Sequence, residues 1–229
     1  MSKFYVVGTP IGNMEDITYR AVKVLSEVDL ILCEDTRVTR NLLSHYEIRT
    51  STMSYHTQSK LSKIDDVIDM LKNGKNIALV SDAGTPTISD PGFLLIASIR
   101  EQLPELEVVA VPGASAMVSA LSISGIPTAD FTFLGFLPHK KGRQTLFKEI
   151  AQSERTMVFY ESPHRIMKTL ESLNGVLPVG KKVVIARELT KVFEQVVRGS
   201  AEEVLKYFQN NTDKVRGEFV VMVSPEKKK

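Results

Sequence analysis

Short apolar runs alternate along this chain with segments of helical periodicity, and this alternation restricts the possible folds more than any other feature. Each run suits a buried strand and is too short for a helix. In the first half the runs occupy residues 4–7, 30–33, 77–80 and 108–111. Residues 64–71 place apolar side chains three and four positions apart, as on one face of a helix. The pattern predicts an α/β fold whose N-terminal half is an open, mainly parallel sheet with helices on both faces.

The second half of the chain also predicts a sheet, but one of mixed strand direction. The expected strands are residues 131–133, 157–160, 183–186, 194–198 and 219–223, and the expected helices are residues 143–151, 164–173 and 201–209. Ser200 and Glu203 have the spacing of a capping box, which favours a helix that begins at residue 201. Some of these strands lie too close in sequence for a helical crossover, so part of the sheet is expected to be antiparallel.

Proline and glycine punctuate residues 112–127, which is typical of a boundary between domains. We therefore expect an N-terminal α/β domain of residues 1–116 and a C-terminal α/β domain of residues 117–229, with a ligand cleft between them.

Composition excludes several classes of protein and site. A single cysteine, Cys33, excludes an internal disulfide framework and a multi-cysteine zinc site, and its apolar surroundings place it in the core. The histidines His45, His56, His139 and His164 have no metal-ligand spacing, so no metal site is expected. No apolar stretch is long enough for a signal peptide or a membrane span. We expect a cytoplasmic protein.

Loops rich in glycine, proline and small polar residues follow the first and third predicted strands, at residues 8–13 and 81–92. In an open α/β sheet, ligands bind beyond the carboxyl ends of the strands. The first loop matches neither a Walker motif nor G-x-G-x-x-G, and a simple tight turn is an equal alternative. Asp82 could accept a hydrogen bond from a ribose hydroxyl or an amino group. Asp90 is expected to cap the helix that starts near Pro91.

Two further loops, residues 32–37 and 111–116, follow the second and fourth strands. Small residues in the later loop leave backbone N–H groups free at a helix start, for a ligand or for a close helix contact. In the earlier loop Glu34, Asp35 and Arg37 could position a polar substrate. Equally, Asp35 could cap the next helix while Arg37 pairs with a carboxylate.

Three more segments complete the pattern: Gly-Phe-Leu-Pro at residues 135–138, Phe-Tyr-Glu-Ser-Pro-His-Arg at 159–165 and Arg-Glu-Leu-Thr-Lys at 187–191. Together with the four loops they resemble the ribosomal RNA ribose methyltransferases of the tetrapyrrole methylase superfamily. The resemblance runs from Phe4 to about Val223, and seven motifs in one order make it specific. Many relatives carry a small helical C-terminal extension, whereas this sequence ends shortly after Pro225.

The resemblance implies a two-domain tetrapyrrole-methylase-like fold and an S-adenosylmethionine-dependent enzyme that 2′-O-methylates the ribose of a cytidine in 16S (small-subunit) ribosomal RNA. It also implies a homodimer that needs neither a metal nor a membrane. The expected cofactor-binding residues are Pro10, Asp82, Ala83, Gly84, Thr85, Ser115, Ala116, Tyr160, Glu161, Ala186 and Arg187.

Methyl transfer from a sulfonium is an in-line displacement, so the protein mainly aligns the reacting atoms. A ribose hydroxyl is a poor nucleophile while protonated, and a base is therefore useful; Asp35 is preferred over Glu34 and Glu188. Arg37, Arg187 and Lys191 would hold phosphates or lower the pKa of a neighbour. For Glu188 and Lys191 a surface ion pair is an equal alternative. The expected catalytic residues are Asp35, Arg37, Glu188 and Lys191.

A net charge of only +2 means that RNA would be bound through a local patch. Lys140, Lys141 and Arg143 share one loop and would extend the RNA track, although a solvated surface is the simpler interpretation. Phe136 is a possible stacking platform for a splayed base, and Glu34 completes the expected RNA contacts.

Two other functions remain open. The same fold could methylate a tetrapyrrole precursor, because a fold does not fix its substrate. The basic loop and the segments at residues 34–37 and 187–191 favour RNA instead. A non-catalytic nucleotide- or RNA-binding module is the second alternative, and the long loops at the predicted strand ends argue against it.

Overall fold

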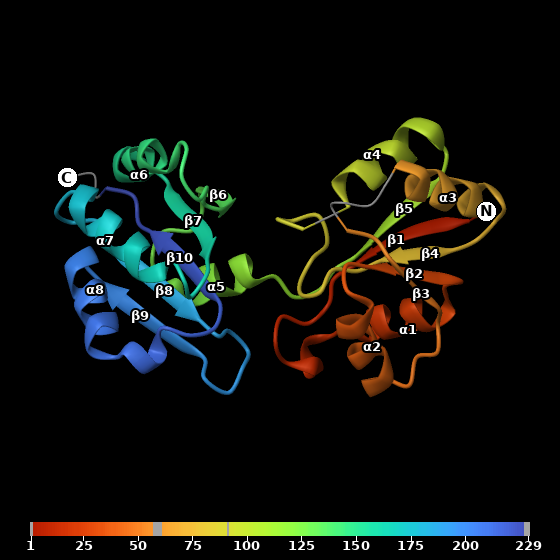
Figure 1. Ribbon diagram of the computed structural model, residues 1–229, viewed down its shortest axis with the longest axis horizontal. Helices are drawn as coiled ribbons and strands as arrows, with labels where there is room; N and C mark the ends of the chain where they lie inside the picture. The colour runs from red at the N-terminus through yellow and green to blue at the C-terminus, as the bar shows by residue number, and fades with distance from the viewer. Residues whose placement is uncertain (1, 57–60, 91, 227–229) are drawn as a thin grey trace. The chain divides into compact units, whose positions relative to one another are not determined.

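The computed structural model describes residues 2–56, 61–90 and 92–226, which form two compact units. Unit 1 comprises Met1–Ser115 and unit 2 comprises Ala116–Lys229. Each unit is built on its own five-stranded sheet (Figure 1). The expected α/β architecture, with one parallel and one mixed sheet, is confirmed.

The sheet of unit 1 is parallel throughout and has the order β3-β2-β4-β1-β5. Its strands are β1 (Lys3–Val7), β2 (Leu30–Cys33), β3 (Thr52–Ser54), β4 (Ile77–Leu79) and β5 (Glu107–Val111). β1 lies between β4 and β5, with Phe4 opposite both Ile77 and Val108. The short edge strand β3 has no strong apolar pattern, which is why the sequence did not predict it.

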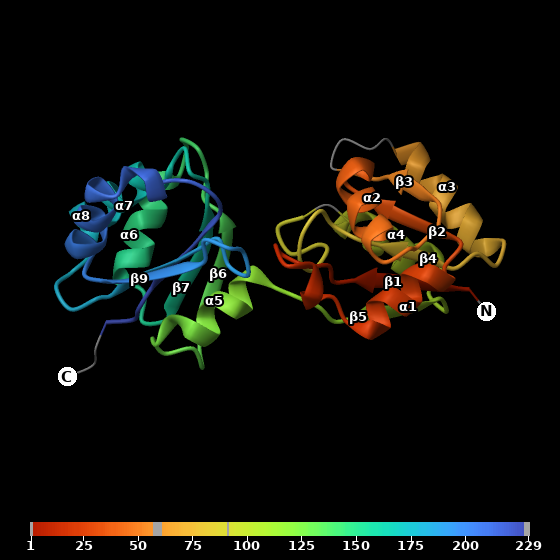
Figure 2. The same cartoon turned by 90° about the horizontal axis from the view of Figure 1, so that it is seen from below.

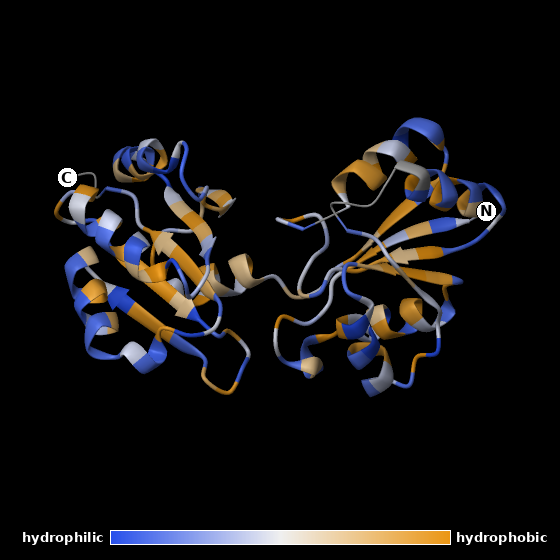
Figure 3. Cartoon of the chain, viewed as in Figure 1, coloured by the Kyte–Doolittle hydropathy of each residue, from blue (hydrophilic) through white to orange (hydrophobic). Residues whose placement is uncertain are grey.

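Helices cover both faces of this sheet, as expected (Figure 1). They are α1 (Tyr19–Glu27), α2 (Thr36–His45), α3 (Leu61–Lys72) and α4 (Phe93–Gln102). Each face carries its own buried apolar cluster. One cluster joins the sheet to α3 and α4, and the other joins it to α1 and α2. The strands of this sheet are coloured largely as hydrophobic in Figure 3. Cys33 is fully buried in the second cluster, so its expected place in the core is confirmed.

Side-chain caps decide where two of these helices begin. The Thr18 hydroxyl accepts from the backbone N–H of Ala21 and caps the start of α1. Asp35 caps α2 by accepting from the backbone N–H of Arg37. The cap predicted for Asp90 is wrong, because α4 begins after Gly92 and has no side-chain cap.

Unit 2 has a mixed sheet of order β6-β7-β10-β8-β9. Its strands are β6 (Phe131–Phe136), β7 (Thr156–Glu161), β8 (Val183–Arg187), β9 (Gln195–Gly199) and β10 (Phe219–Val223). β6 and β7 are parallel, whereas β10 is antiparallel to both β7 and β8, and β8 is antiparallel to β9. The C-terminal strand thus lies at the centre of the sheet.

Four helices complete unit 2 (Figure 2). They are α5 (Ala116–Ser124), α6 (Arg143–Gln152), α7 (Ile166–Val176) and α8 (Ala201–Asn210). One apolar core joins α6, α7 and α8 to the sheet, while α5 contacts β8 and β10. The capping box of Ser200 and Glu203 is present at the start of α8, as predicted. In the described part of the chain, no helix combines the length and hydrophobicity that crossing a bilayer requires.

Candidate active site

Three loops of unit 1 leave neighbouring strands at the same edge of the sheet. β4, β1 and β5 are adjacent and parallel, so their carboxyl ends lie side by side. The loops that follow them are residues 80–92, 8–13 and 112–115. These are three of the four loops predicted to carry the site, and ligands of open α/β sheets bind at this edge.

The loops after β1 and β5 cross at a point where only glycine fits. A Cβ atom placed on Gly8 would lie 2.8 Å from the Cα atom of Gly113, and one placed on Gly113 would lie 2.7 Å from the carbonyl oxygen of Gly8. The backbone N–H of Gly8 donates to the carbonyl of Val111 at 3.0 Å. Two backbones therefore touch here without any side chain between them.

The loop after β4 joins this crossing through a second set of backbone contacts. Thr9 and Gly84 exchange backbone hydrogen bonds of 2.9 and 3.1 Å in an isolated antiparallel bridge. The Thr85 hydroxyl donates to the carbonyl of Ala114 at 3.2 Å. Gly84 has φ +84°, which explains why glycine occupies this position. The three loops form one connected structure, as their positions in the sequence predicted.

The fourth predicted loop, after β2, is linked through Asp82 to the loop after β4. The Asp82 carboxylate accepts from the backbone N–H of Asp35 at 3.0 Å, and Asp82 is otherwise exposed. Asp35 itself is engaged by Arg37, whose Nε and NH2 atoms donate to its two oxygens at 3.0 and 2.6 Å. Hydrogen bonds from the Arg37 side chain and backbone lower the pKa of Asp35 to about 2. The predicted alternative, a cap with an arginine partner, is what the structure shows for Asp35.

Two other carboxyl groups of the same region have raised pKa values. Burial, and then the charge of Asp82, raise the pKa of Glu34. Burial raises the pKa of Asp90 to about 6, with further contributions from Glu34 and Asp82, although a hydrogen bond with Ser81 opposes the shift. A carboxyl group that titrates near neutral pH is suited to accept a proton. Sequence reasoning missed Asp90, because an aspartate before proline and glycine is also a common helix-start signal.

The remaining residues around these loops are small and uncharged. Pro10 is buried, Ala83 is exposed, and Ser115 and Ala116 are half-buried. No group of three or more histidine, cysteine, aspartate or glutamate side chains in the described ranges is arranged to hold a metal ion. The groups that these loops can present to a ligand are therefore backbone donors and acceptors, a few hydroxyls and the carboxylates.

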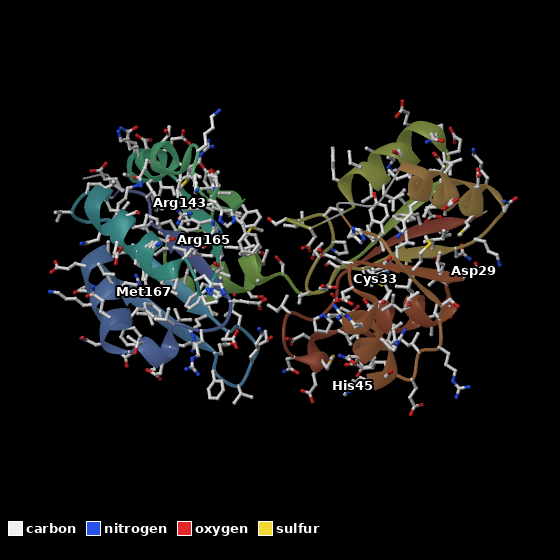
Figure 4. All side chains as sticks on the ribbon, viewed as in Figure 1. Asp29, Cys33, His45, Arg143, Arg165 and Met167 are labelled. Atoms are coloured by element: carbon white, nitrogen blue, oxygen red, sulfur yellow. The ribbon has the colours of Figure 1, made fainter. Side chains whose placement is uncertain are left out.

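In unit 2, Glu161 is completely buried and surrounded by donors. Its Oε2 atom accepts from Arg143 at 3.1 Å and from the Thr169 hydroxyl at 2.7 Å, and its Oε1 atom lies 2.8 Å from Nε of Arg165. The side chain of Glu161 is 0% exposed and that of Arg143 only 12%. Figure 4 shows Arg143 and Arg165 close together in this unit. Arg143 therefore does not lie on the surface track predicted for it, since its guanidinium is turned onto a buried carboxylate.

The segment after β8 holds its charged residues in internal contacts. Arg187 is buried and donates to the carbonyls of Arg216 and Phe193 at 2.8 and 3.2 Å. Lys191 lies between two carboxylates, 3.1 Å from Glu188 and 2.8 Å from Glu218. Burial would raise the pKa of Glu188, but hydrogen bonds from Glu218 and Lys191 outweigh it and lower the pKa. The ion pair that the sequence left open for Glu188 and Lys191 is present.

Two backbone conformations in that segment are strained. Glu188 has φ +51° and Thr190 has φ +66°, although neither is glycine. Non-glycine residues with positive φ values persist only where surrounding contacts hold them, and such residues concentrate at functional sites. The predicted donor residue Ala186 is buried in β8, opposite Val220 of β10.

The predicted RNA residues Phe136, Lys140 and Lys141 are exposed. Phe136 is 57% exposed and packs edge-on against Tyr160, with ring centroids 5.4 Å apart. Phe133 contacts the same tyrosine at 5.0 Å.

Comparison with known proteins identifies relatives over almost the whole chain. Residues 3–205 match the family model of the Tetrapyrrole (Corrin/Porphyrin) Methylases. A Synechocystis protein named Ribosomal RNA small subunit methyltransferase I is 46% identical over 225 residues, which are 98% of this chain and 79% of that protein. A Thermotoga maritima protein of the same name is 44% identical over 224 residues, 98% of this chain and 99% of the relative.

Solved structures share the fold at much lower sequence identity. Uroporphyrin-III-C-methyltransferase from Thermus thermophilus has a TM-score of 0.67 and 18% identity, with 98% of this chain and 94% of that chain covered. At this identity the likeness concerns the arrangement of helices and strands and not the substrate.

Proposed function

Because the chain belongs to the tetrapyrrole methylase family, we propose that it transfers a methyl group from S-adenosylmethionine to the ribose 2′-hydroxyl of a cytidine in 16S (small-subunit) ribosomal RNA. The family membership makes it a methyltransferase. The observation that carries the RNA substrate is the 44–46% identity, along 98% of the chain, to proteins named for small-subunit ribosomal RNA.

The loops of unit 1 suit the proposed methyl donor. S-adenosylmethionine carries a nucleoside, an amino acid moiety and a sulfonium, and supplies an electrophilic methyl group when bound. Ala83, Pro112 and Gly113 are exposed, and we expect their backbone to offer hydrogen-bond partners for the uncharged nucleoside. Asp82 is the carboxylate of these loops that we expect to face the positive part of the donor. No lysine or arginine occurs in residues 8–13, 80–92 or 112–116, so a polyphosphate would find no cation there.

We infer that Pro10, Gly84, Thr85 and Ser115 shape this donor site. The crossing of Gly8 and Gly113 fixes the distance between two of its loops, so the backbone is in position before a ligand arrives. Positioning of this kind is the main contribution a protein makes to an in-line displacement. Ala83 and Ala116 would add apolar contacts, and Tyr160, Ala186 and Arg187 of unit 2 stay predicted donor contacts.

Proton removal from the ribose hydroxyl needs a base whose pKa lies near the working pH. Asp35 is poorly suited, because Arg37 holds its pKa at about 2. We therefore assign Asp35 and Arg37 to substrate positioning at the start of α2. Asp90, with a pKa of about 6, and Glu34, with a raised pKa, are better proton acceptors.

The remaining predicted residues fit supporting roles. Glu188 and Lys191 hold each other and Glu218 in place, so we assign them to the rigidity of the loop after β8 and not to proton transfer. A substrate in the small ribosomal subunit would place the protein in the cytoplasm.

A homodimer is a further part of the proposal. Apolar side chains that a soluble monomer usually covers are exposed around the start of α4, where Phe93 is 70% and Leu94 61% exposed. Light scattering of the purified protein at several concentrations would measure the mass, and a monomer throughout would contradict this part.

The decisive experiment supplies radiolabelled S-adenosylmethionine and compares two acceptors. Small ribosomal subunits from cells that lack this protein should incorporate one methyl group per subunit, and mapping should place it on a ribose 2′-oxygen of a cytidine. A tetrapyrrole precursor should not be labelled. Label in the precursor, or in a base and not a ribose, would overturn the proposed function.

A further inference from the structure

We propose that Phe136 and the loop of residues 137–142, here named the basic loop, form a contact surface for single-stranded RNA, and that buried Glu161 is the residue that positions it. The inference rests on the proposed function, because it deepens the identity of the substrate site. It gives Glu161 a positioning role in place of the donor contact that sequence reasoning predicted.

The basic loop is tied to Glu161 through two arginines. Arg165 contacts Oε1 of Glu161 at 2.8 Å and donates through NH1 to the carbonyl of Leu137 at 2.9 Å. Arg143 contacts Oε2 of Glu161 at 3.1 Å and donates through NH1 to the carbonyl of Pro138 at 3.1 Å. One buried carboxylate thus orients two guanidinium groups, and each guanidinium holds one backbone carbonyl of the loop.

Further contacts fix the remaining positions of the basic loop. The side chain of Leu137 is buried in the core of unit 2, at 1% exposure. The backbone N–H of Arg143 donates to the carbonyl of Lys140 at 3.3 Å, and Gly142 takes the left-handed conformation at φ +83° where α6 begins. The loop is anchored at both ends, so its outward side chains are held at defined points.

The side chains that this scaffold presents are cationic and unpaired. Lys140 and Lys141 are exposed, and neither makes an ion pair or a side-chain hydrogen bond with any residue that the structure describes. This distinguishes them from Lys191 and Lys206, whose ammonium groups lie within 3.1 Å of carboxylates. Free ammonium groups on an anchored loop are suited to phosphates, and the negative charge of Glu161 is kept away from the surface.

An exposed aromatic ring lies immediately before these cations. The pairing of β6 with β7 shifts register between Phe133 and Phe136, and Gly135 in between has φ +61°. Phe136 lies at the end of this irregular stretch, is 57% exposed and makes a T-shaped ring contact with Tyr160. A supported aromatic ring next to free cations is the combination with which proteins hold unstacked bases and the backbone beside them. Duplex recognition would need no such ring.

The first test measures RNA affinity directly with a cytidine-rich single-stranded oligoribonucleotide at several salt concentrations. We expect the double variant Lys140→Ala/Lys141→Ala to bind about tenfold more weakly and to reduce the slope of log K against log salt by about 1.4, the value for two phosphate contacts on a single strand. Lys148→Ala/Lys168→Ala, which removes two other exposed lysines of unit 2, is the matched control and should leave the slope unchanged. An equal slope for both double variants would overturn the proposed surface.

The second test separates stacking from charge. Phe136→Ala should weaken binding of the oligoribonucleotide about tenfold without changing the salt slope, because an aromatic ring releases no counterions. Phe136→Trp should restore the affinity. If Phe136→Ala binds as tightly as the unmodified protein, the aromatic part of the surface is wrong.

The third test concerns the positioning role of Glu161. Glu161→Gln should raise the KM for small ribosomal subunits about tenfold while the KM for S-adenosylmethionine stays unchanged. Arg165→Lys keeps a cation beside Glu161 but loses the NH1 donor to the carbonyl of Leu137, and it should show the same split if Glu161→Gln does not fold. Arg155→Lys, in an exposed ion pair with Asp130, is the control.

These outcomes distinguish the inference from the proposed function. A rise in the KM for S-adenosylmethionine in Glu161→Gln would return this residue to the donor site and overturn its positioning role. If the unmodified protein methylates ribosomal subunits but the Lys140→Ala/Lys141→Ala variant keeps its KM for them, the inference fails and the function stands. If the unmodified protein methylates no ribosomal RNA, the function itself fails.

Discussion

The loops at the strand ends of unit 1 and those of unit 2 are held in different ways. In unit 1 backbone touches backbone, at the crossing of Gly8 with Gly113 and at the bridge between Thr9 and Gly84. In unit 2 buried charges hold the loops, with Glu161 between two arginines and Arg187 on two carbonyls. The first arrangement brings backbone and not side chains into contact at this edge of the sheet. The second provides fixed positions from which charged and aromatic side chains can project.

This difference teaches which substitutions each region can bear. A contact between two backbones does not depend on side-chain charge, but it has no room for an added Cβ atom. A buried ion cluster tolerates changes of shape at its edge but not the loss of its single carboxylate, because the remaining cations are then unpaired. Four substitutions test this contrast.

The largest effect is expected for Glu161→Gln. The change leaves Arg143 and Arg165 beside a neutral amide in a buried site, and breaking such a pair costs about 3 kcal/mol. Urea unfolding of both proteins at pH 7 measures the difference. Glu149→Gln, on the exposed side of α6, should change the unfolding free energy by less than about 0.5 kcal/mol. Equal stability of Glu161→Gln and the unmodified protein would contradict the account of unit 2.

The next effect is expected for Gly113→Ala in unit 1. Its Cβ atom would meet the carbonyl oxygen of Gly8 at 2.7 Å, so the two loops must separate. We expect the affinity for S-adenosylmethionine to fall about 100-fold, or about 2.7 kcal/mol, as measured by calorimetry. The matched control is Gly175→Ala in α7, where an added Cβ meets no atom within 4 Å. Unchanged donor affinity in Gly113→Ala would show that the crossing does not shape the donor site.

Asp90→Asn should remove the part of the pH dependence of the unfolding free energy that comes from the Asp90 carboxyl group. The folded-state pKa of Asp90 is raised from 3.8 to about 6, so folding favours its protonated form. Its contribution to stability is complete below about pH 4 and is lost as the pH rises through 6. Between pH 4 and pH 8 the unmodified protein should therefore lose about 1 kcal/mol relative to Asp90→Asn in urea unfolding, because solvent screening reduces the full effect at this half-buried group. Parallel pH profiles for the two proteins would mean that the carboxyl group is not perturbed.

The smallest effect is expected for Asp35→Asn. Asparagine caps helices as well as aspartate does, so α2 should keep its start, while the ion pair with Arg37 is lost. We expect kcat to fall less than tenfold and the acidic limb of the pH–rate profile to stay in place. A fall of about 100-fold or more would restore Asp35 as the base, since general bases typically contribute at least that much.

Much of the fold was predictable because apolar periodicity survives in short segments. β2 and β10 begin and end at the expected residues, and the capping box of Ser200 and Glu203 starts α8. The edge strand β3 was missed, because Thr52–Ser54 is half-buried and carries no alternating pattern. Two polar residues were misinterpreted for a related reason: Asp90 was expected to cap α4, and Arg143 to face RNA. The carboxylate that Arg143 contacts lies at the end of β7, and the charge of Glu34 that acts on Asp90 comes from the loop after β2, so neither group belongs to the same element as the residue it affects.

The order of strands, loops and motifs along the chain was thus determined by the sequence itself. Hydrophobic periodicity, glycine and proline determine local structure, because their effects extend over only a few neighbouring residues. Only the tertiary structure decided which carboxyl groups are engaged in ion pairs and which have a raised pKa. Glu161 is held by two arginines, and burial beside Glu34 and Asp82 raises the pKa of Asp90. Burial and charge depend on distances through space, and residues 8 and 113 touch although more than one hundred positions separate them.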